Sequence, residues 1–460
     1  MKLGEIFINM NKYTPVIGLE VHVELNTKSK MFCSCSADYF GKAPNTHTCP
    51  VCLGLPGALP FANEEAIKKC IQIGLALNCS ISEDSLFERK NYFYPDLAKG
   101  FQISQLRWPL CVGGWIEVKS DSGEVSKIRI NRVHQEEDTG KLTHTGGETL
   151  IDYNRSSVPL TEIVTEPDFT DSSQIRDYAK KLQQIFRYLG VSNADMEKGD
   201  MRLEANVSVR KVTSDKGQVT SQEKFELPNY RVELKNINSF RFMVAAVEYE
   251  IKRQIKALEA GEKLTQETRG WDEAKKQTFL QRSKEEANDY RYFPEPDLPK
   301  MKISKDFVDK IALELPELPV KKAERYINEY GISEVVAETI VGEETLAELF
   351  DGAVKLGNEE NVPAKEVANY LANQKIDSLR VSPDEIIQKI KEKKSGKIDN
   401  QDELAKIAEE VIKENEQSVN AYKNGKETAI MALVGGMMRK TQGKADANKS
   451  KEVLERLLKV

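Results

Sequence analysis

The sequence of 460 residues lacks any uninterrupted apolar run of the roughly 18 residues that a transmembrane helix requires. Its first residues, MKLGEIFINMNKY, lack the basic flank and apolar stretch of a secretory signal, so we expect a cytoplasmic protein. In that compartment cysteines stay reduced, which favours metal binding over disulfide formation.

Familiar phosphate-binding and nucleophile motifs are also missing. The sequence contains neither Gly-x-x-x-x-Gly-Lys-Ser/Thr nor Gly-x-Gly-x-x-Gly, which excludes a P-loop and a Rossmann phosphate cradle. It has no Gly-x-Ser-x-Gly elbow, and only four histidines are available for a nucleophilic triad. An ATP site in this chain would therefore be of another kind.

Charge is unevenly distributed along the chain. The 67 Lys and Arg residues are outnumbered by 73 Asp and Glu residues, which gives a net charge of −6. Residues 421–460 nevertheless carry nine basic and four acidic residues, a local balance of +5. A basic end of this kind is typical of a nucleic-acid contact or of a solvated helix face, and charge alone favours the second.

Composition and periodicity predict a globular α+β protein. The sequence is 40% hydrophobic and 30% charged, unlike disordered or fibrous chains. Helices are expected at residues 172–189 and 243–260, and strands at 16–25, 127–134, 202–209 and 231–237. Strands interleaved with few helices favour a mainly antiparallel sheet.

The C-terminal part has a different character. From Lys305 to Val460 the sequence is rich in Ala, Glu, Lys and Leu with helical periodicity, and proline is sparse after Pro319. The polar stretch 391–402 fits a linker between two helical units. We expect three parts: an α+β domain at 1–298, a helical domain at 299–395 and a helical tail at 403–460.

Four cysteines form two close pairs. Cys33-x-Cys35 is separated by thirteen residues from Cys49-x-x-Cys52. Four thiolates suit a tetrahedral structural Zn²⁺, although the first pair is tighter than the usual spacing. The alternative is four unpaired cysteines that happen to cluster, and His47 is a possible substitute ligand.

Polar faces of the expected strands could carry chemistry. Alternation places Glu20, His22 and Glu24 on one face of residues 16–25, where they could hold a divalent cation or form a solvated face. Similar faces carry His134 to Asp138, with three consecutive carboxylates, and the sets Arg202/Glu204 and Glu233/Lys235. Together they suit Mg²⁺-dependent phosphate transfer, with solvated strand faces as the alternative.

Eight motifs occur in order between Thr14 and Leu298: VIGLEVHVEL, PNTHTCPVCLGLPGALP, FERKNYFYPDLAKGFQISQ, HQEEDTGKLTH, DYNRSSVPLTEIVTEPDF, ELKNINSFR, QETRGWD and DYRYFPEPDLP. NEQSVNAYKNGK and MALVGGMMRKTQGKA follow near the end. Together they closely resemble the family of B subunits of tRNA-dependent aspartyl/glutamyl amidotransferases.

The resemblance implies a function and partners. The family's B subunit uses ATP and Mg²⁺ to activate the side-chain carboxylate of Glu or Asp misacylated onto tRNA(Gln) or tRNA(Asn). An amidase-type A subunit supplies ammonia from glutamine, and a small C subunit completes a heterotrimer. The implied fold is a cradle-like catalytic domain with a zinc-binding insert, a helical domain and a tRNA-binding helical tail.

The resemblance also implies roles for individual residues. Catalytic roles fall to Glu20, His22, Glu136, Glu233 and Lys235, and the first three of these are the candidate magnesium ligands. Roles toward the cofactor fall to Lys90, Arg202 and Glu204, with Lys90 on the ammonia route. Glu204 stands where the family has Asp, and the helical region before the tail is shorter than usual.

Two other classes of function fit parts of the sequence. A non-catalytic zinc-containing RNA-binding adaptor would need the cysteines and the basic tail but not the acidic strand faces. A free-standing carboxylate–amine ligase acting on a small metabolite would leave the basic tail unexplained.

Overall fold

The computed structural model describes residues 12–212, 227–283, 289–395, 401–441 and 444–458. The chain divides into two compact units, Met1–Pro319 and Val320–Val460, which we call unit 1 and unit 2. None of the helices in these described ranges combines the length and apolar character that crossing a membrane requires.

Unit 1 is built on a nine-stranded sheet with the order β14-β13-β12-β11-β1-β10-β7-β6-β2. Its strands are β1 (Tyr13–Glu24), β2 (Ser80–Ile81), β6 (Cys111–Lys119), β7 (Val125–Glu137), β10 (Pro159–Thr165), β11 (Met201–Lys211), β12 (Val232–Leu234), β13 (Glu267–Asp272) and β14 (Gln277–Ser283). All neighbouring pairs are antiparallel except β12 and β13. The predicted α+β class with a mainly antiparallel sheet is confirmed.

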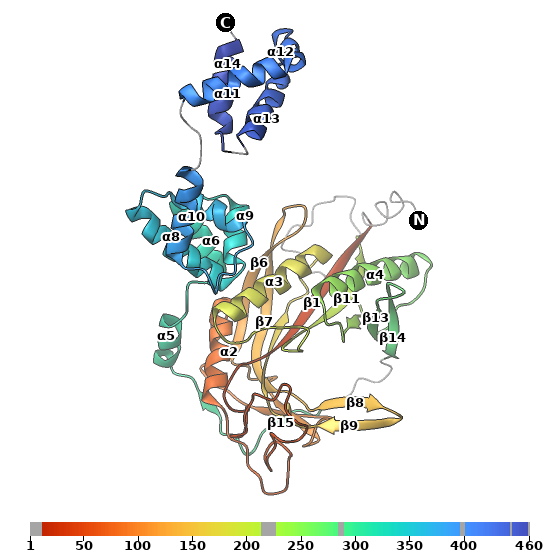
Figure 1. The fold of residues 1–460 in the computed structure, drawn as a ribbon. Coiled ribbons are helices and arrows are strands. Elements are labelled where there is room, and N and C mark those ends of the chain that lie inside the picture. The colour runs from red at the N-terminus through yellow and green to blue at the C-terminus, as the bar shows by residue number, and fades with distance from the viewer. Residues whose placement is uncertain (1–11, 213–226, 284–288, 396–400, 442–443, 459–460) are drawn as a thin grey trace. The chain divides into compact units, whose positions relative to one another are not determined.

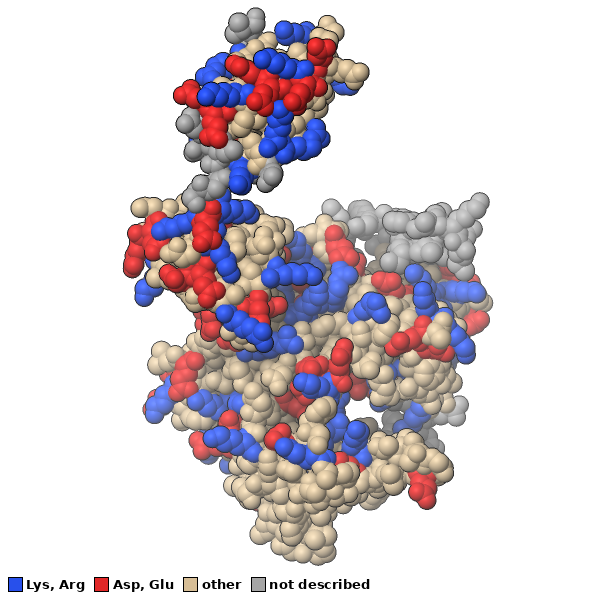
Figure 2. Space-filling view, in the orientation of Figure 1, with Lys and Arg blue, Asp and Glu red and all other residues tan. Residues whose placement is uncertain are grey.

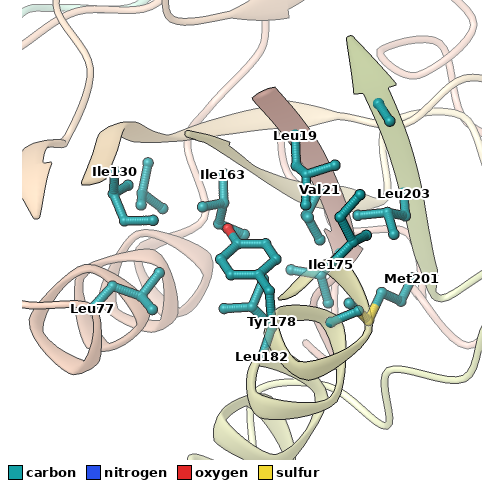
Figure 3. Close-up of a cluster of buried hydrophobic side chains, with 14 of the residues drawn as sticks. Leu19, Val21, Leu77, Ile130, Ile163, Ile175, Tyr178, Leu182, Met201 and Leu203 are labelled. Carbon is teal, nitrogen blue, oxygen red and sulfur yellow. The ribbon is translucent and has the colours of Figure 1, made fainter. Parts of the chain in front are cut away.

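One face of this sheet packs against α2 (Glu64–Ala76), α3 (Ser172–Tyr188) and α4 (Phe240–Glu259) (Figure 1). Val21 of β1 and Ile163 of β10 point toward Tyr178 and Leu182 of α3 in the buried core (Figure 3). Burial of such side chains supplies the main driving force for this layer. Because side chains alternate along a strand, the intervening polar residues are turned to the opposite face.

The predicted helices and strands lie close to the observed ones. Asp171 caps α3 by accepting a hydrogen bond from the Ser173 amide, while its own amide donates to Gln174, which forms a capping box. The strand predicted at 231–237 is shorter, since β12 ends at Leu234 and Asn236 has a positive φ of 60°.

Smaller strands complete unit 1. A three-stranded sheet joins β15 (Phe293–Pro294), β4 (Glu88–Asn91) and β5 (Phe101–Ser104), and β8 (Lys141–Thr145) pairs with β9 (Glu148–Asp152). The strands β3 (Asp84–Ser85) and β16 (Met301–Lys302) also pair, and α5 (Lys305–Leu313) packs on α2. Unit 1 thus extends past the predicted boundary at Leu298.

Unit 2 is helical, as predicted. Its elements are α6 (Pro319–Tyr330), α7 (Glu334–Val341), α8 (Glu344–Glu359), α9 (Ala364–Asn373), α10 (Pro383–Ser395), α11 (Gln401–Glu414), α12 (Glu416–Lys423), η1 (Glu427–Ala429), α13 (Ile430–Lys440) and α14 (Ala447–Leu458). The helices from α11 onward share a hydrophobic core of their own that includes Leu404, Leu433 and Leu454. The stretch predicted as a linker is helical at both ends, and residues 396–400 lie outside the described residues.

Candidate functional site

The face of the large sheet opposite the helices carries the charged side chains predicted for a site. On β1, Val21 is buried against the helices while His22 points the other way. The antiparallel register places His22 directly opposite Glu162 of β10 and Arg202 of β11. Glu162 in turn lies opposite His134 of β7. Four neighbouring strands therefore contribute one row of ionisable side chains.

Two histidines and two glutamates of this region form a compact cluster. His134 Nε2 lies 3.2 Å from Glu136 Oε1 and 3.2 Å from Glu162 Oε2. His22 Nε2 lies 3.5 Å from Glu162 Oε2 and 3.9 Å from Glu136 Oε2. Suitable ligand atoms of His22, Glu136 and Glu162 all lie within 4.8 Å of one another, which is close enough to hold one metal ion.

Electrostatics couples the four groups. Burial favours neutral imidazoles, but the neighbouring carboxylates outweigh it and raise the pKa of His22 and of His134 to about 9. Burial alone would raise the pKa of Glu162, but the two histidines hold it well below its usual value. Two ionised carboxylates are thus balanced by two protonated imidazoles. A divalent cation would bring the same charge, so its binding would release protons.

The small sheet approaches this cluster from its open side. Ser104 of β5 donates from Oγ to Glu136 Oε1 over 2.5 Å, and Gln102 donates from Nε2 to Glu136 Oε2 over 3.1 Å. Lys90 of β4 pairs with Gln102, and its ammonium lies 5.2 Å from the ring centroid of Tyr290. Burial disfavours the charged form of Lys90, but Glu136 and other nearby groups outweigh burial and raise its pKa.

Arg202 is engaged by carboxylates at the end of the row. It forms ion pairs with Asp138 and, over 3.0 Å, with Glu24 Oε1. Tyr39 donates from Oη to Glu24 Oε2 over 2.8 Å, and Arg155 Nε lies 3.6 Å from Asp138. Burial and the adjacent Asp138 charge raise the pKa of Glu24 to about 8. About a third of the Arg202 side chain is exposed, so one edge still faces solvent.

A second acidic group continues across β1, β11 and β12. Glu20 lies opposite Glu204, and Asn206 lies opposite Glu233. The Asn206 side chain donates from Nδ2 to Glu20 Oε1 over 2.8 Å, and Lys235 Nζ lies 3.4 Å from Glu233 Oε2. Burial raises the pKa of Glu204. This part of the face is acidic but contains one cation.

The four cysteines also converge. The Sγ atoms of Cys33, Cys35, Cys49 and Cys52 all lie within 4.8 Å of one another. The Cys49 amide donates to Cys52 Sγ over 3.1 Å. A hydrogen bond from Cys33, helped by that amide and by the Lys30 ammonium, lowers the pKa of Cys52 to about 4 although burial opposes it. Four convergent sulfurs with one favoured thiolate fit a closed tetrahedral Zn²⁺ site.

The structure brings some of the predicted site residues together and separates others. His22 and Glu136 converge, whereas Glu20, the third predicted magnesium ligand, is hydrogen-bonded to Asn206 and is not in the convergent set. Lys90 and Arg202 border the cluster from opposite directions. Glu204, Glu233 and Lys235 belong to the second acidic group, and all four predicted zinc ligands meet.

Sequence reasoning missed Glu162 and gave no role to His134. Glu162 is the one acidic residue in the otherwise uncharged run Pro159–Thr165, where most neighbours are buried. A lone carboxylate in a buried strand needs a partner, and this was the available signal. His134 lies two residues before Glu136 and therefore on the same face of β7.

Comparison with known proteins matches nearly the whole chain. Residues 15–309 match the family described as the GatB/GatE catalytic domain, and residues 319–458 match the GatB domain. The chain is 43% identical to the B subunit of the aspartyl/glutamyl-tRNA(Asn/Gln) amidotransferase of Thermotoga maritima over 494 aligned positions, covering 97% of this chain and 99% of that protein.

Other relatives of the same name show the same degree of similarity. The protein from Thermoanaerobacter pseudethanolicus is 44% identical over 486 positions, covering 96% of this chain and 99% of its own length. The protein from Thermodesulfovibrio yellowstonii is 43% identical over 490 positions, covering 97% and 100%. These matches, together with the two family domains, confirm that the chain belongs to the family of aspartyl/glutamyl-tRNA(Asn/Gln) amidotransferase B subunits.

Proposed function

We propose that this chain activates the side-chain carboxylate of Glu-tRNA(Gln), Asp-tRNA(Asn) or both with ATP, and converts it to the amide. A carboxylate oxygen attacks the γ-phosphorus of ATP and ADP leaves. Ammonia then attacks the carbonyl carbon of the acyl phosphate, a proton is lost and phosphate leaves. The observation that carries the proposal is the convergence of His22, Glu136 and Glu162 on the sheet face.

Residues of the cluster would hold and orient the reacting groups. Mg²⁺ prefers oxygen ligands, which Glu136 and Glu162 provide, and His22 completes the set or orients one of them. When bound, Mg²⁺ would neutralise charge that develops on the transferred phosphoryl group. His134 bridges the two glutamates and holds them in place.

The second acidic group would serve the substrates. We propose that Glu20, Glu204 and Glu233 line the approach of ATP, and that Lys235 pairs with a nucleotide phosphate or with the acyl phosphate. Arg202, held by Glu24 and Asp138, would present its free edge to the nucleotide.

Ammonia must come from a partner, because the chain offers no good candidate for a glutamine-hydrolysing nucleophile. We propose an amidase-type A subunit as its source and a small C subunit that completes a heterotrimer. Lys90, between Glu136 and the ring of Tyr290, would lie on the ammonia route.

An apolar surface supports the proposal of a partner. Exposed hydrophobic side chains are concentrated between β1 and α2, at Phe40, Leu55, Leu59 and Phe61. Figure 2 shows few charged side chains over this lower part of unit 1. Such a surface suits a protein–protein interface better than solvent. The substrates of the reaction place the proposed activity in the cytoplasm.

The tail at 403–460 is proposed to bind tRNA. Arg439 and Lys444 are exposed, whereas the Lys440 ammonium lies 2.8 Å from Glu410 and 2.7 Å from Glu414. Phosphate contacts are therefore assigned to Arg439 and Lys444. A zinc-containing adaptor would share this tail but would not require a buried cluster of glutamates and histidines, so it is not favoured.

Replacing Glu136 by Gln should lower amidation of misacylated tRNA by at least about 100-fold, because the cluster loses a charged oxygen ligand. Glutamine hydrolysis by the partner, measured without ATP or tRNA, should persist. Glu148→Gln on exposed β9 is the matched control and should leave both activities unchanged. A parallel fall of both activities in an intact complex would show that Glu136 has another role.

Purified protein should contain about one Zn²⁺ per chain. Cys49→Ser should remove the metal and lower the melting temperature more than it lowers the activity of the protein that stays folded. Cys79→Ser changes a buried cysteine outside the cluster and should keep the zinc. Elemental analysis that finds no bound metal in the unaltered protein would contradict the site.

The double variant Arg439→Ala/Lys444→Ala should weaken tRNA binding and flatten its salt dependence by about 1.5 in log–log slope, since each phosphate contact contributes about 0.7–0.9. Lys275→Ala, which removes an exposed cation of the β13–β14 turn, is the matched control. Affinity measured over a salt series provides the test. Equal slopes for all three proteins would show that the tail cations are merely solvated.

A further inference from the structure

The segment that carries the four cysteines also contains a lysine that is out of contact with solvent. Lys30 is fully buried, although a lysine ammonium is almost never buried without an anionic partner. It follows β1 and precedes Cys33 by three residues. Among the residues that the structure describes, no carboxylate lies within ion-pairing distance of its Nζ.

The three hydrogens of this ammonium have three acceptors. Lys30 Nζ donates to the carbonyl oxygen of His47 over 2.7 Å and to that of Tyr153 over 3.4 Å. The third acceptor is Cys52 Sγ at 3.6 Å. Two acceptors are neutral, so the sulfur is the only one of the three that can carry the compensating negative charge.

The charge of a four-cysteine zinc centre explains this arrangement. Four thiolates around Zn²⁺ leave two excess negative charges in a largely buried place, since Cys33 and Cys52 are both buried. One adjacent ammonium halves this excess, and its N–H···S hydrogen bond orients one ligand. Four neutral thiols would instead leave Lys30 buried without any counter-charge. The lysine and the metal centre therefore account for each other.

We propose that Lys30 is the counter-ion of the four-cysteine metal centre and fixes its affinity for Zn²⁺. This inference rests on the proposed zinc site and is independent of the amidation chemistry. Lys30 acts through Cys52 and is not itself a ligand.

The same lysine connects the metal centre to the sheet. Tyr153 lies in the segment that leads into β10, and in that segment Ser156 donates from Oγ to the Cys52 carbonyl over 3.1 Å. The Met31 amide donates to the Ser157 carbonyl over 2.7 Å, and the Ser157 amide donates to the Asp138 carbonyl over 2.9 Å. The centre is thus anchored where β7 ends and β10 begins.

The test compares Lys30→Gln with Lys28→Gln. Gln keeps N–H donors for the carbonyl groups but removes the charge, whereas Lys28 lies two residues earlier and is exposed. Zinc retention is measured against a chelator of increasing concentration. We expect Lys30→Gln to bind zinc about 10–100-fold more weakly, as is typical for groups that support metal ligands, and Lys28→Gln to match the unaltered protein.

Two further readouts separate a charge effect from general loosening. Lys30→Arg restores the charge and should recover part of the zinc affinity. In the Co²⁺-substituted protein, Lys30→Gln should shift the thiolate-to-metal charge-transfer band, and Lys28→Gln should not. Equal zinc affinities and equal spectra for all variants would overturn the proposal while leaving the zinc site intact. A metal-free unaltered protein would overturn both.

If Lys30→Gln does not fold, acylation of amines in the unaltered protein gives the answer. Lys30 should resist the reagent in the zinc-bound protein and react after chelation, whereas Lys28 should react in both states. Protection of Lys30 that does not depend on the metal would contradict its role as a counter-ion.

Discussion

The site depends on the mutual neutralisation of two buried glutamates and two buried histidines across β1, β10 and β7. Glu136 and Glu162 would repel each other strongly if both were ionised without cations nearby. His134, which is 3.2 Å from each, allows the carboxylates to stay close together and charged. His22 closes the cluster from the side of β1. The resulting pair of convergent carboxylates is what a divalent cation needs.

This cluster exists because the sheet has a fixed register. A slip of one residue in β10 would move Glu162 to the face that packs on α3 and bring Ile163 into the site. The apolar contacts of α3 with β1 and β10 therefore protect the chemistry on the opposite face (Figure 3). The anchoring of the cysteine segment beside Ser157 holds the start of β10 in the same way.

Much of this organisation follows from the sequence. Alternation in β1 and β11 and helical spacing in α3 are strong local signals, and four clustered cysteines are a strong metal signal. Which strand lies beside which is set by long-range pairing that no local pattern encodes. For that reason Glu162 was missed although it lies directly opposite His22. Likewise, the ion pairs of Lys440 with α11 were invisible in a count of charges.

The central claim is that a substrate carboxylate attacks the γ-phosphorus of ATP at this cluster. The most direct measurement uses misacylated tRNA with ¹⁸O in both oxygens of the side-chain carboxylate, together with the complete complex, ATP, Mg²⁺ and glutamine. We predict that each phosphate released in step with amide formation carries one ¹⁸O atom, because the attacking oxygen leaves with phosphorus. Phosphate that carries no ¹⁸O from the substrate, formed at the same rate as the amide, would contradict activation by phosphorylation.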